Sequence, residues 1–165
     1  MIEKIVSGGQ TGVDQAGLFI ASEVGLPIGG WCPKGGLDER GFNVLNKYQT
    51  LKEASTPIPD ERTKLNIRDS DGTLIIVPCW PLSEKIKDGT RLTITDAKQQ
   101  KKPYLIVSLT AKLDLNHIIL QWIVKNNIKI LNIAGPRESN APGIYKETCE
   151  LFRELFADLK PRPRL

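Results

Sequence analysis

Cysteine and histidine are scarce in this chain of 165 residues. The three cysteines, Cys32, Cys79 and Cys149, form no C-x-x-C pair, which excludes a disulfide framework and a paired-thiol zinc site. The one histidine, His117, excludes a histidine-rich metal centre and weakens the case for a Ser-His triad. The sequence therefore predicts no metal site built from the side chains of the protein.

Long apolar runs and a strong net charge are also missing. No apolar run approaches the roughly 20 residues that a membrane helix needs, and the start of the chain lacks the layout of a signal peptide. We therefore expect a cytoplasmic protein without membrane contact. The net charge of +4 favours a small anionic ligand and is too small to favour nucleic acid. We expect one domain over residues 1–160 and a flexible basic tail at 161–165.

The chain does contain a glycine-rich stretch, Ser7–Gln15, between an apolar run, Ile2–Val6, and an amphipathic run, Val13–Val24. This order predicts a strand, a turn and a helix. The glycines permit positive φ and close approach of a ligand, and the N–H groups at the start of the helix favour an anion, above all a phosphate. The alternative is a tight turn that binds nothing.

Two better-known phosphate motifs do not fit this stretch. A Walker A loop needs a Gly-Lys-Ser/Thr ending, which follows neither Gly8 nor Gly9. The dinucleotide fingerprint needs G-x-G-x-x-G and an acidic residue at the end of the second strand, where this chain has Lys34. Both departures argue against ordinary NTP hydrolysis and against NAD chemistry.

Strands and helices alternate along the rest of the chain. Further strands are predicted at 27–31, 48–51, 73–77, 103–109 and 129–134, and further helices at 61–70, 92–101, 115–123 and 144–159. This alternation predicts an α/β fold: a single doubly wound Rossmann-like domain. Its mostly parallel sheet has about six strands in the order 3-2-1-4-5-6, with helices on both faces.

Four polar or glycine-rich segments follow strands of this predicted sheet: 7–12, 34–35, 78–90 and 135–137. Ligands of such sheets bind beyond the carboxyl ends of the strands, so we expect one anion site there. Gly9, Thr11, Gly12 and Arg137 are expected to hold a phosphate, with Asp14 orienting the loop or a ligand hydroxyl. The alternative for Arg137 is a surface ion pair with a neighbouring glutamate.

Several motifs resemble the molybdenum cofactor carrier family. They are the string Gly8–Gly17, followed by Arg62-Thr63, Asn66, Ser70–Thr73 and Gly135-Pro136-Arg137. The family is part of a Rossmann-like group that also includes the "lysine decarboxylase-like" phosphoribohydrolases and a DNA-processing protein. The resemblance implies a six-stranded doubly wound sheet, a homo-oligomer (dimer or tetramer) and a molybdopterin-type or nucleotide-like ligand.

The phosphoribohydrolases carry a P-G-G-x-G-T-x-x-E signature after the central strand. This chain has Pro78-Cys79-Trp80-Pro81 there, without those glycines or the glutamate. We therefore expect a binding, carrier or sensor protein for a phosphorylated heterocycle, with molybdenum cofactor (molybdopterin) as the best candidate. The alternatives are a nucleotide-processing enzyme, with Asp14, Asp71 or Glu138 as acid or base, and a protein-interaction module.

The candidate ligand-binding residues are those that follow the strands and those that carry the resemblance: Gly8, Gly9, Gln10, Thr11, Gly12, Asp14, Lys34, Gly35, Arg62, Ser70, Asp71, Gly89, Thr90, Gly135, Pro136 and Arg137. No catalytic residue is assigned. Cys32 and Cys79 also follow strands that flank the site and could touch a soft metal. We favour the other interpretation, that they are small buried apolar residues.

Overall fold

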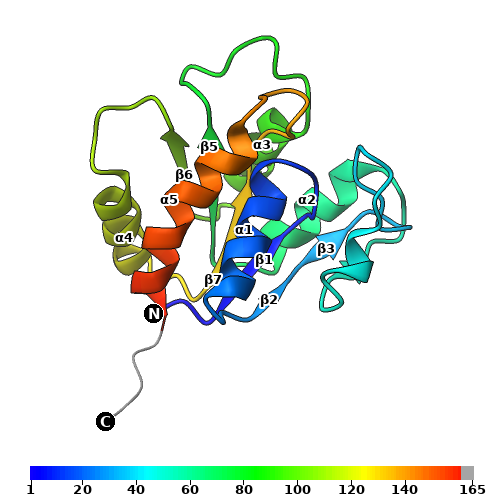
Figure 1. The fold of residues 1–165 in the computed structure, drawn as a ribbon, viewed down its shortest axis with the longest axis horizontal. Coiled ribbons are helices and arrows are strands. Elements are labelled where there is room, and N and C mark those ends of the chain that lie inside the picture. Colours follow the sequence, from blue (N-terminus) through cyan, green and yellow to red (C-terminus); the bar gives the residue numbers. More distant parts are fainter. Residues whose placement is uncertain (161–165) are drawn as a thin grey trace.

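The computed structural model describes residues 1–160 as an α/β fold with a parallel sheet between two layers of helices (Figure 1). The strands of the sheet are β1 (Lys4–Ser7), β2 (Ile28–Gly29), β5 (Gly72–Val77), β6 (Tyr104–Ser108) and β7 (Ile130–Ala134). Helices α1 (Val13–Glu23), α4 (Leu115–Lys125) and α5 (Ile144–Leu159) cover one face. Helices α2 (Pro59–Arg68) and α3 (Thr90–Gln99) cover the other face. The Rossmann-like class predicted from the sequence is confirmed, and the basic tail predicted at 161–165 lies outside the described residues.

The number and order of the strands differ from the prediction. The sheet has five strands in the order β2-β1-β7-β5-β6, so the last strand in sequence lies at the centre. β7 pairs in parallel with β1 on one side and with β5 on the other. The predicted order 3-2-1-4-5-6, which put the last strand at an edge, is wrong because apolar strands of similar length carry no signal for their neighbours.

The predicted strand 48–51 is also replaced by other structure. A 3₁₀ helix spans Val44–Asn46, and the short strand β4 (Lys52–Glu53) pairs with β3 (Trp31–Cys32) in a separate two-stranded sheet. Tyr48 and Leu51 instead pack into a small apolar cluster with Cys32 and Val44. Gly30, at φ +116, separates β2 from β3 and explains why the predicted strand 27–31 is divided.

Buried apolar side chains fix the main layers. Every residue of β5 is buried, as expected for a central parallel strand. Helix α5 turns Phe152 and Phe156 inward, and their rings stack 4.5 Å apart. His117 lies exposed on α4. Among residues 1–160, no helix has the length and apolar character that a membrane span requires.

Candidate functional site

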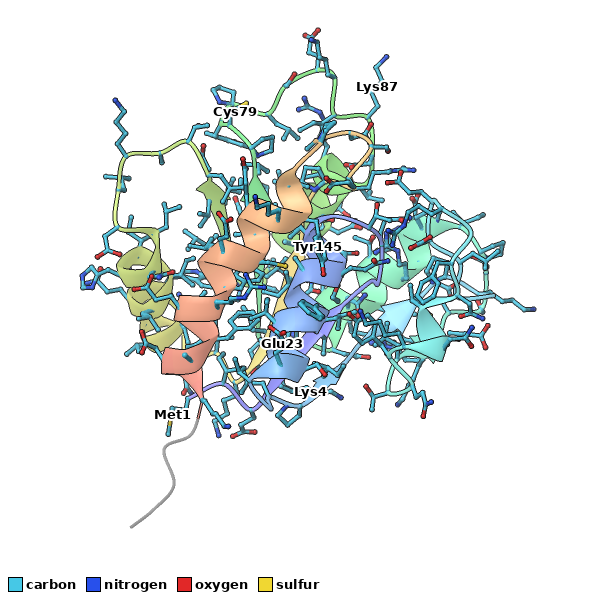
Figure 2. The ribbon with its side chains drawn as sticks, viewed as in Figure 1. Met1, Lys4, Glu23, Cys79, Lys87 and Tyr145 are labelled. Atoms are coloured by element: carbon cyan, nitrogen blue, oxygen red, sulfur yellow. The ribbon has the colours of Figure 1, made fainter. Side chains whose placement is uncertain are left out.

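A cavity of about 380 Å³ lies between α2 and α3, beyond the carboxyl ends of β1 and β7. We call it the α2–α3 cavity. It is lined by glycines, polar and charged side chains and four apolar residues: Gly8, Gln10, Asp14, Pro59, Asp60, Arg62, Thr63, Asn66, Lys87, Asp88, Gly89, Thr90, Leu92, Thr93, Asn132, Ile133, Ala134, Gly135 and Arg137. Figure 2 places Lys87 on the outer part of the loop between β5 and α3, and Lys4 and Glu23 at the opposite end of the molecule.

The structure brings half of the predicted site residues together around this cavity. Those that line it are Gly8, Gln10, Asp14, Arg62, Gly89, Thr90, Gly135 and Arg137. Those that do not line it are Gly9, Thr11, Gly12, Lys34, Gly35, Ser70, Asp71 and Pro136. Residues that sequence reasoning missed include Asp88, Thr93 and Asn132.

Arg62 joins helix α2 to the glycine-rich turn. Its Nη1 atom donates a hydrogen bond to Oδ2 of Asp14 over 3.1 Å, and the two side chains are 13% and 6% exposed. Its guanidinium occupies the space that a Cβ at Gly8 would need. The absence of a side chain at Gly8 therefore makes room for Arg62, a residue of the cavity.

Two arginines of the cavity keep a buried N–H without an acceptor. Within residues 1–160, neither Nε of Arg62 nor Nε of Arg137 has a hydrogen-bond partner. A buried donor without a partner costs about 1–3 kcal/mol, and more for a charged group. An anion in the cavity would supply acceptors to guanidinium groups that come from two separate elements.

Asp14 is a buried carboxyl group at the inner end of this arrangement. It is 4% exposed, and burial raises its pKa from 3.8 to about 6. Arg62 and the N–H of Gln10 oppose this rise, whereas the nearby charge of Asp88 adds to it. A carboxyl with a raised pKa in a cleft is typical of functional sites.

The raised pKa makes Asp14 a source of pH-dependent stability. The native protein binds this proton more tightly than the unfolded chain, so the stabilisation is complete below pH 4 and is lost as pH rises through 6. We expect the unfolding free energy of Asp14→Asn, relative to wild type, to increase by about 2 kcal/mol between pH 4 and pH 7. Urea unfolding of both proteins at several pH values measures this. Parallel stability curves would contradict it.

The turn itself uses most of its N–H groups internally. The amide of Gly9 donates to Ser7 Oγ, that of Gln10 to Asp14 Oδ2, and that of Thr11 to Oε1 of Gln10. Two of its glycines face protein: a Cβ at Gly9 would lie 3.1 Å from Val44, and one at Gly12 would meet backbone atoms of 136–138. The phosphate contacts predicted for Gly9, Thr11 and Gly12 stay a prediction.

A carboxylate from the neighbouring loop lies over the outer side of this turn. Glu39, whose side chain is 15% exposed, accepts hydrogen bonds from the hydroxyl groups of Thr11 and Ser139 and from the backbone N–H of Ser139. Its Oε2 lies 3.9 Å from Nη1 of Arg137. These contacts lower the pKa of Glu39, against the opposing effect of its burial. Glu39 is therefore ionised, and it joins Thr11, Ser139 and Arg137 at the outer edge of the site.

Asp88 ties the start of α3 to the loop after β7. Its carboxylate accepts from the N–H and hydroxyl of Thr90, from the N–H of Arg137 and from Nδ2 of Asn140. A Cβ at Gly89 would meet nothing within 4 Å. The start of α3 is thus anchored beside Arg137, and an added side chain at Gly89 would meet open space.

The remaining predicted residues lie elsewhere. Asp71 accepts from the N–H groups of Lys129 and Ile130, at the amino end of the sheet, and the hydroxyl of Ser70 donates to Ile67 O. The N–H groups of Lys34 and Gly35 bond to the segment around β4.

The three cysteines lie outside the α2–α3 cavity. Cys32 and Cys149 are buried, and Cys79 is partly exposed on the loop after β5 (Figure 2). None of them lines the cavity. Among residues 1–160, no three His, Cys, Asp or Glu side chains are grouped so as to hold a metal ion.

Fold and site together define a Rossmann-like α/β protein with an arginine-lined polar cavity at the carboxyl edge of its sheet. The chain belongs to the family described as "Circularly permutated YpsA SLOG", whose profile matches residues 5–156. The strand order agrees with that description: counted from β7 onward and continued at β1, the sheet reads 3-2-1-4-5. This is the strand order of a doubly wound sheet, in which the present chain begins at the second strand and reaches the first strand, β7, last.

A solved structure supports the same family. The crystal structure named "Putative molybdenum carrier protein", from Syntrophus aciditrophicus SB, is similar to this chain with a TM-score of 0.83 and 42% sequence identity. The alignment covers 94% of each chain. No curated protein matches this chain. The resemblance identified from the sequence motifs is therefore confirmed at the level of the family.

Proposed function

We propose that the protein binds a phosphorylated heterocycle in the α2–α3 cavity and acts as its carrier or sensor, with molybdenum cofactor as the best candidate ligand. The observation that carries this proposal is the pair of buried, unpartnered Nε groups of Arg62 and Arg137 on one cavity within residues 1–160. Two guanidinium groups whose Nε atoms lack an acceptor fit a dianionic phosphate.

The size and position of the cavity support a small-molecule ligand. Its volume of about 380 Å³ lies within the range of roughly 300–1,000 Å³ typical of such sites. It lies beyond strand ends at the carboxyl edge of a parallel sheet, where this class of fold binds ligands. The name of the similar protein from Syntrophus aciditrophicus SB supports a molybdenum-containing cargo.

The residues of the cavity are suited to bind molybdenum cofactor by its phosphate group. Arg62 and Arg137 would hold the phosphate, and the polar walls of the cavity would face the pterin. The cofactor would contribute the molybdenum and its own ligands. We further propose that the protein works in the cytoplasm as a homo-oligomer, as the resemblance implies, and that residues 1–160 are one domain.

One observation favours a second candidate, a nucleotide-processing enzyme. Asp14 is buried in the cavity beside Arg62 and has a pKa of about 6, close to the value that suits a general acid or base near neutral pH. Among the carboxylates considered from the sequence, Asp71 lies at the other end of the sheet, and Glu138 caps the start of α5 through Gly143 and Tyr145. Asp14 is therefore the remaining candidate.

One purification separates these functions. The protein is isolated from a host that makes molybdenum cofactor and assayed for molybdenum and for oxidised pterin fluorescence after denaturation. We expect both in near-stoichiometric amounts, and loss of both in Arg137→Ala, because one charge-assisted contact contributes roughly 1.5–3 kcal/mol. Arg153→Ala, an exposed change on α5, is the matched control.

A panel of nucleoside monophosphates tests the enzyme alternative with the same preparation. Release of base or phosphate that is lost in Asp14→Asn would favour catalysis. Absence of bound pterin together with no protection of added cofactor would refute the carrier proposal.

A further inference from the structure

Two polar side chains interrupt the apolar centre of the sheet. Thr73 on β5 and Asn132 on β7 are aligned in neighbouring strands, and they are 0% and 3% exposed. They lie on the sheet face covered by α2 and α3, because the next residue of β7, Ile133, contacts Gly17 of α1 on the other face. Asn132 lines the α2–α3 cavity.

Only one end of the Asn132 amide is satisfied by protein. Its Nδ2 donates to Oγ1 of Thr73 over 3.2 Å. Its Oδ1 has no hydrogen bond within residues 1–160 and is not among the fully buried unpartnered atoms, so it is open to the cavity that Asn132 lines. An amide oxygen that is open to a cavity can be paired there by a donor of a ligand or by water. An asparagine does not improve the packing of a central strand. The unpaired Oδ1 of Asn132 at the cavity therefore indicates a hydrogen-bond acceptor for a ligand.

The neighbouring polar groups of the cavity are acceptors as well. The hydroxyl of Thr63 donates to the carbonyl of Pro59, and that of Thr93 donates to the carbonyl of Gly89. Each hydroxyl has one hydrogen, so what it offers the cavity is lone pairs. The inner part of the cavity therefore accepts hydrogen bonds, whereas the two arginines donate them.

We propose that Asn132 accepts a hydrogen bond from the ring of the ligand and so selects heterocycles that present N–H donors, such as an amino group or a cyclic amide. This inference rests on the proposed function, since it assumes that the arginines hold a phosphate on the same molecule. The ligand class is thus a phosphate ester joined to a donor-bearing ring, as in aminopterins and guanine. A site built to pair a ring N–H rejects an analogue that lacks it.

Three phosphates test this selection by calorimetry: guanosine 5′-monophosphate, purine riboside 5′-monophosphate, whose ring has no N–H donor, and ribose 5-phosphate, which has no ring. We expect wild-type protein to bind the guanosine compound about tenfold more tightly than the purine riboside compound, the effect of one or two hydrogen bonds. In Asn132→Ala this ratio should fall to about one, with the affinity for ribose 5-phosphate unchanged. Thr73→Ala, which removes only the anchor of the amide, should lower the ratio part of the way.

The outcomes separate this inference from the proposed function. Equal binding of the two purine compounds by wild-type protein would overturn the inference and leave phosphate binding intact. A tenfold ratio that survives in a folded Asn132→Ala, or in Thr73→Ala where the first variant does not fold, would also overturn it. If none of the three compounds binds to wild-type protein, phosphate recognition itself fails and the inference falls with it.

Discussion

We expect Gly12→Ala to lower the free energy of unfolding by about 2–6 kcal/mol. Gly12 has φ +77 and ψ −128, a region that side-chain-bearing residues rarely adopt and that costs an alanine on the order of 1–3 kcal/mol. A Cβ there would also meet the carbonyl oxygen of Pro136 and lie 2.9 Å from the backbone nitrogen of Glu138. Overpacking of this kind costs about 1–3 kcal/mol, and backbone atoms cannot rotate away. Urea unfolding measures the loss.

Two other glycines provide matched controls for this variant. Gly143 has φ +90 in the left-handed region with nothing within 4 Å of an added Cβ, so Gly143→Ala shows the cost of a positive φ without a steric clash. Gly89 has φ −68 and open space, so Gly89→Ala should change stability by no more than about 0.5 kcal/mol. If Gly12→Ala were no more harmful than Gly143→Ala, the close packing of the turn against the 136–138 segment would be disproved.

The second large effect concerns Arg62 and depends on the proposed function. We expect Arg62→Ala to weaken the binding of a phosphorylated ligand by about tenfold to a hundredfold, because one charge-assisted contact contributes roughly 1.5–3 kcal/mol. The same change leaves Asp14 buried without its cation, which destabilises the native state above the pKa of that carboxyl. Calorimetric titration of wild type and variant measures the binding.

The design of this experiment must separate binding from folding. Asp14→Asn/Arg62→Ala removes both members of the pair and avoids an unpaired buried charge. Lys64→Ala changes an exposed cation on the same helix and should bind as wild type does. If the double variant binds the ligand as tightly as Asp14→Asn alone, Arg62 is only a partner of Asp14 and does not hold the phosphate.

Local elements could be predicted from the sequence, because their signals are local. The helix predicted at 144–159 has these bounds in the structure, as α5. The β-branched run of β5 identified a strand that is buried throughout. Strand order could not be read in this way, and the predicted position of the last strand was wrong. That error affects the site, because β7 brings Asn132 to the centre of the sheet.

The glycine-rich turn shows a second limit of sequence reasoning. A glycine at positive φ can make room for a ligand or for another part of the protein, and both leave the same residue in the sequence. Here Gly9 makes room for Val44, and Gly12 for the 136–138 segment. The sequence gives no signal for the role of Asp88, because its contacts to Arg137 and Asn140 join distant segments. An asparagine inside an otherwise apolar strand was the available signal for Asn132.

The central place of β7 also determines when the protein can finish folding. Ribosomes make the chain from its amino end, so β7 is the last strand of residues 1–160 to be synthesised. Until it emerges, β1 has only the two-residue strand β2 beside it, and β5 has only β6. The two halves of the sheet join through pairings such as Lys4 with Ile130, which close a very long loop and are slow to form. Because β7 also supplies Asn132 and leads into Arg137, a nascent chain acquires its cavity only in this final step.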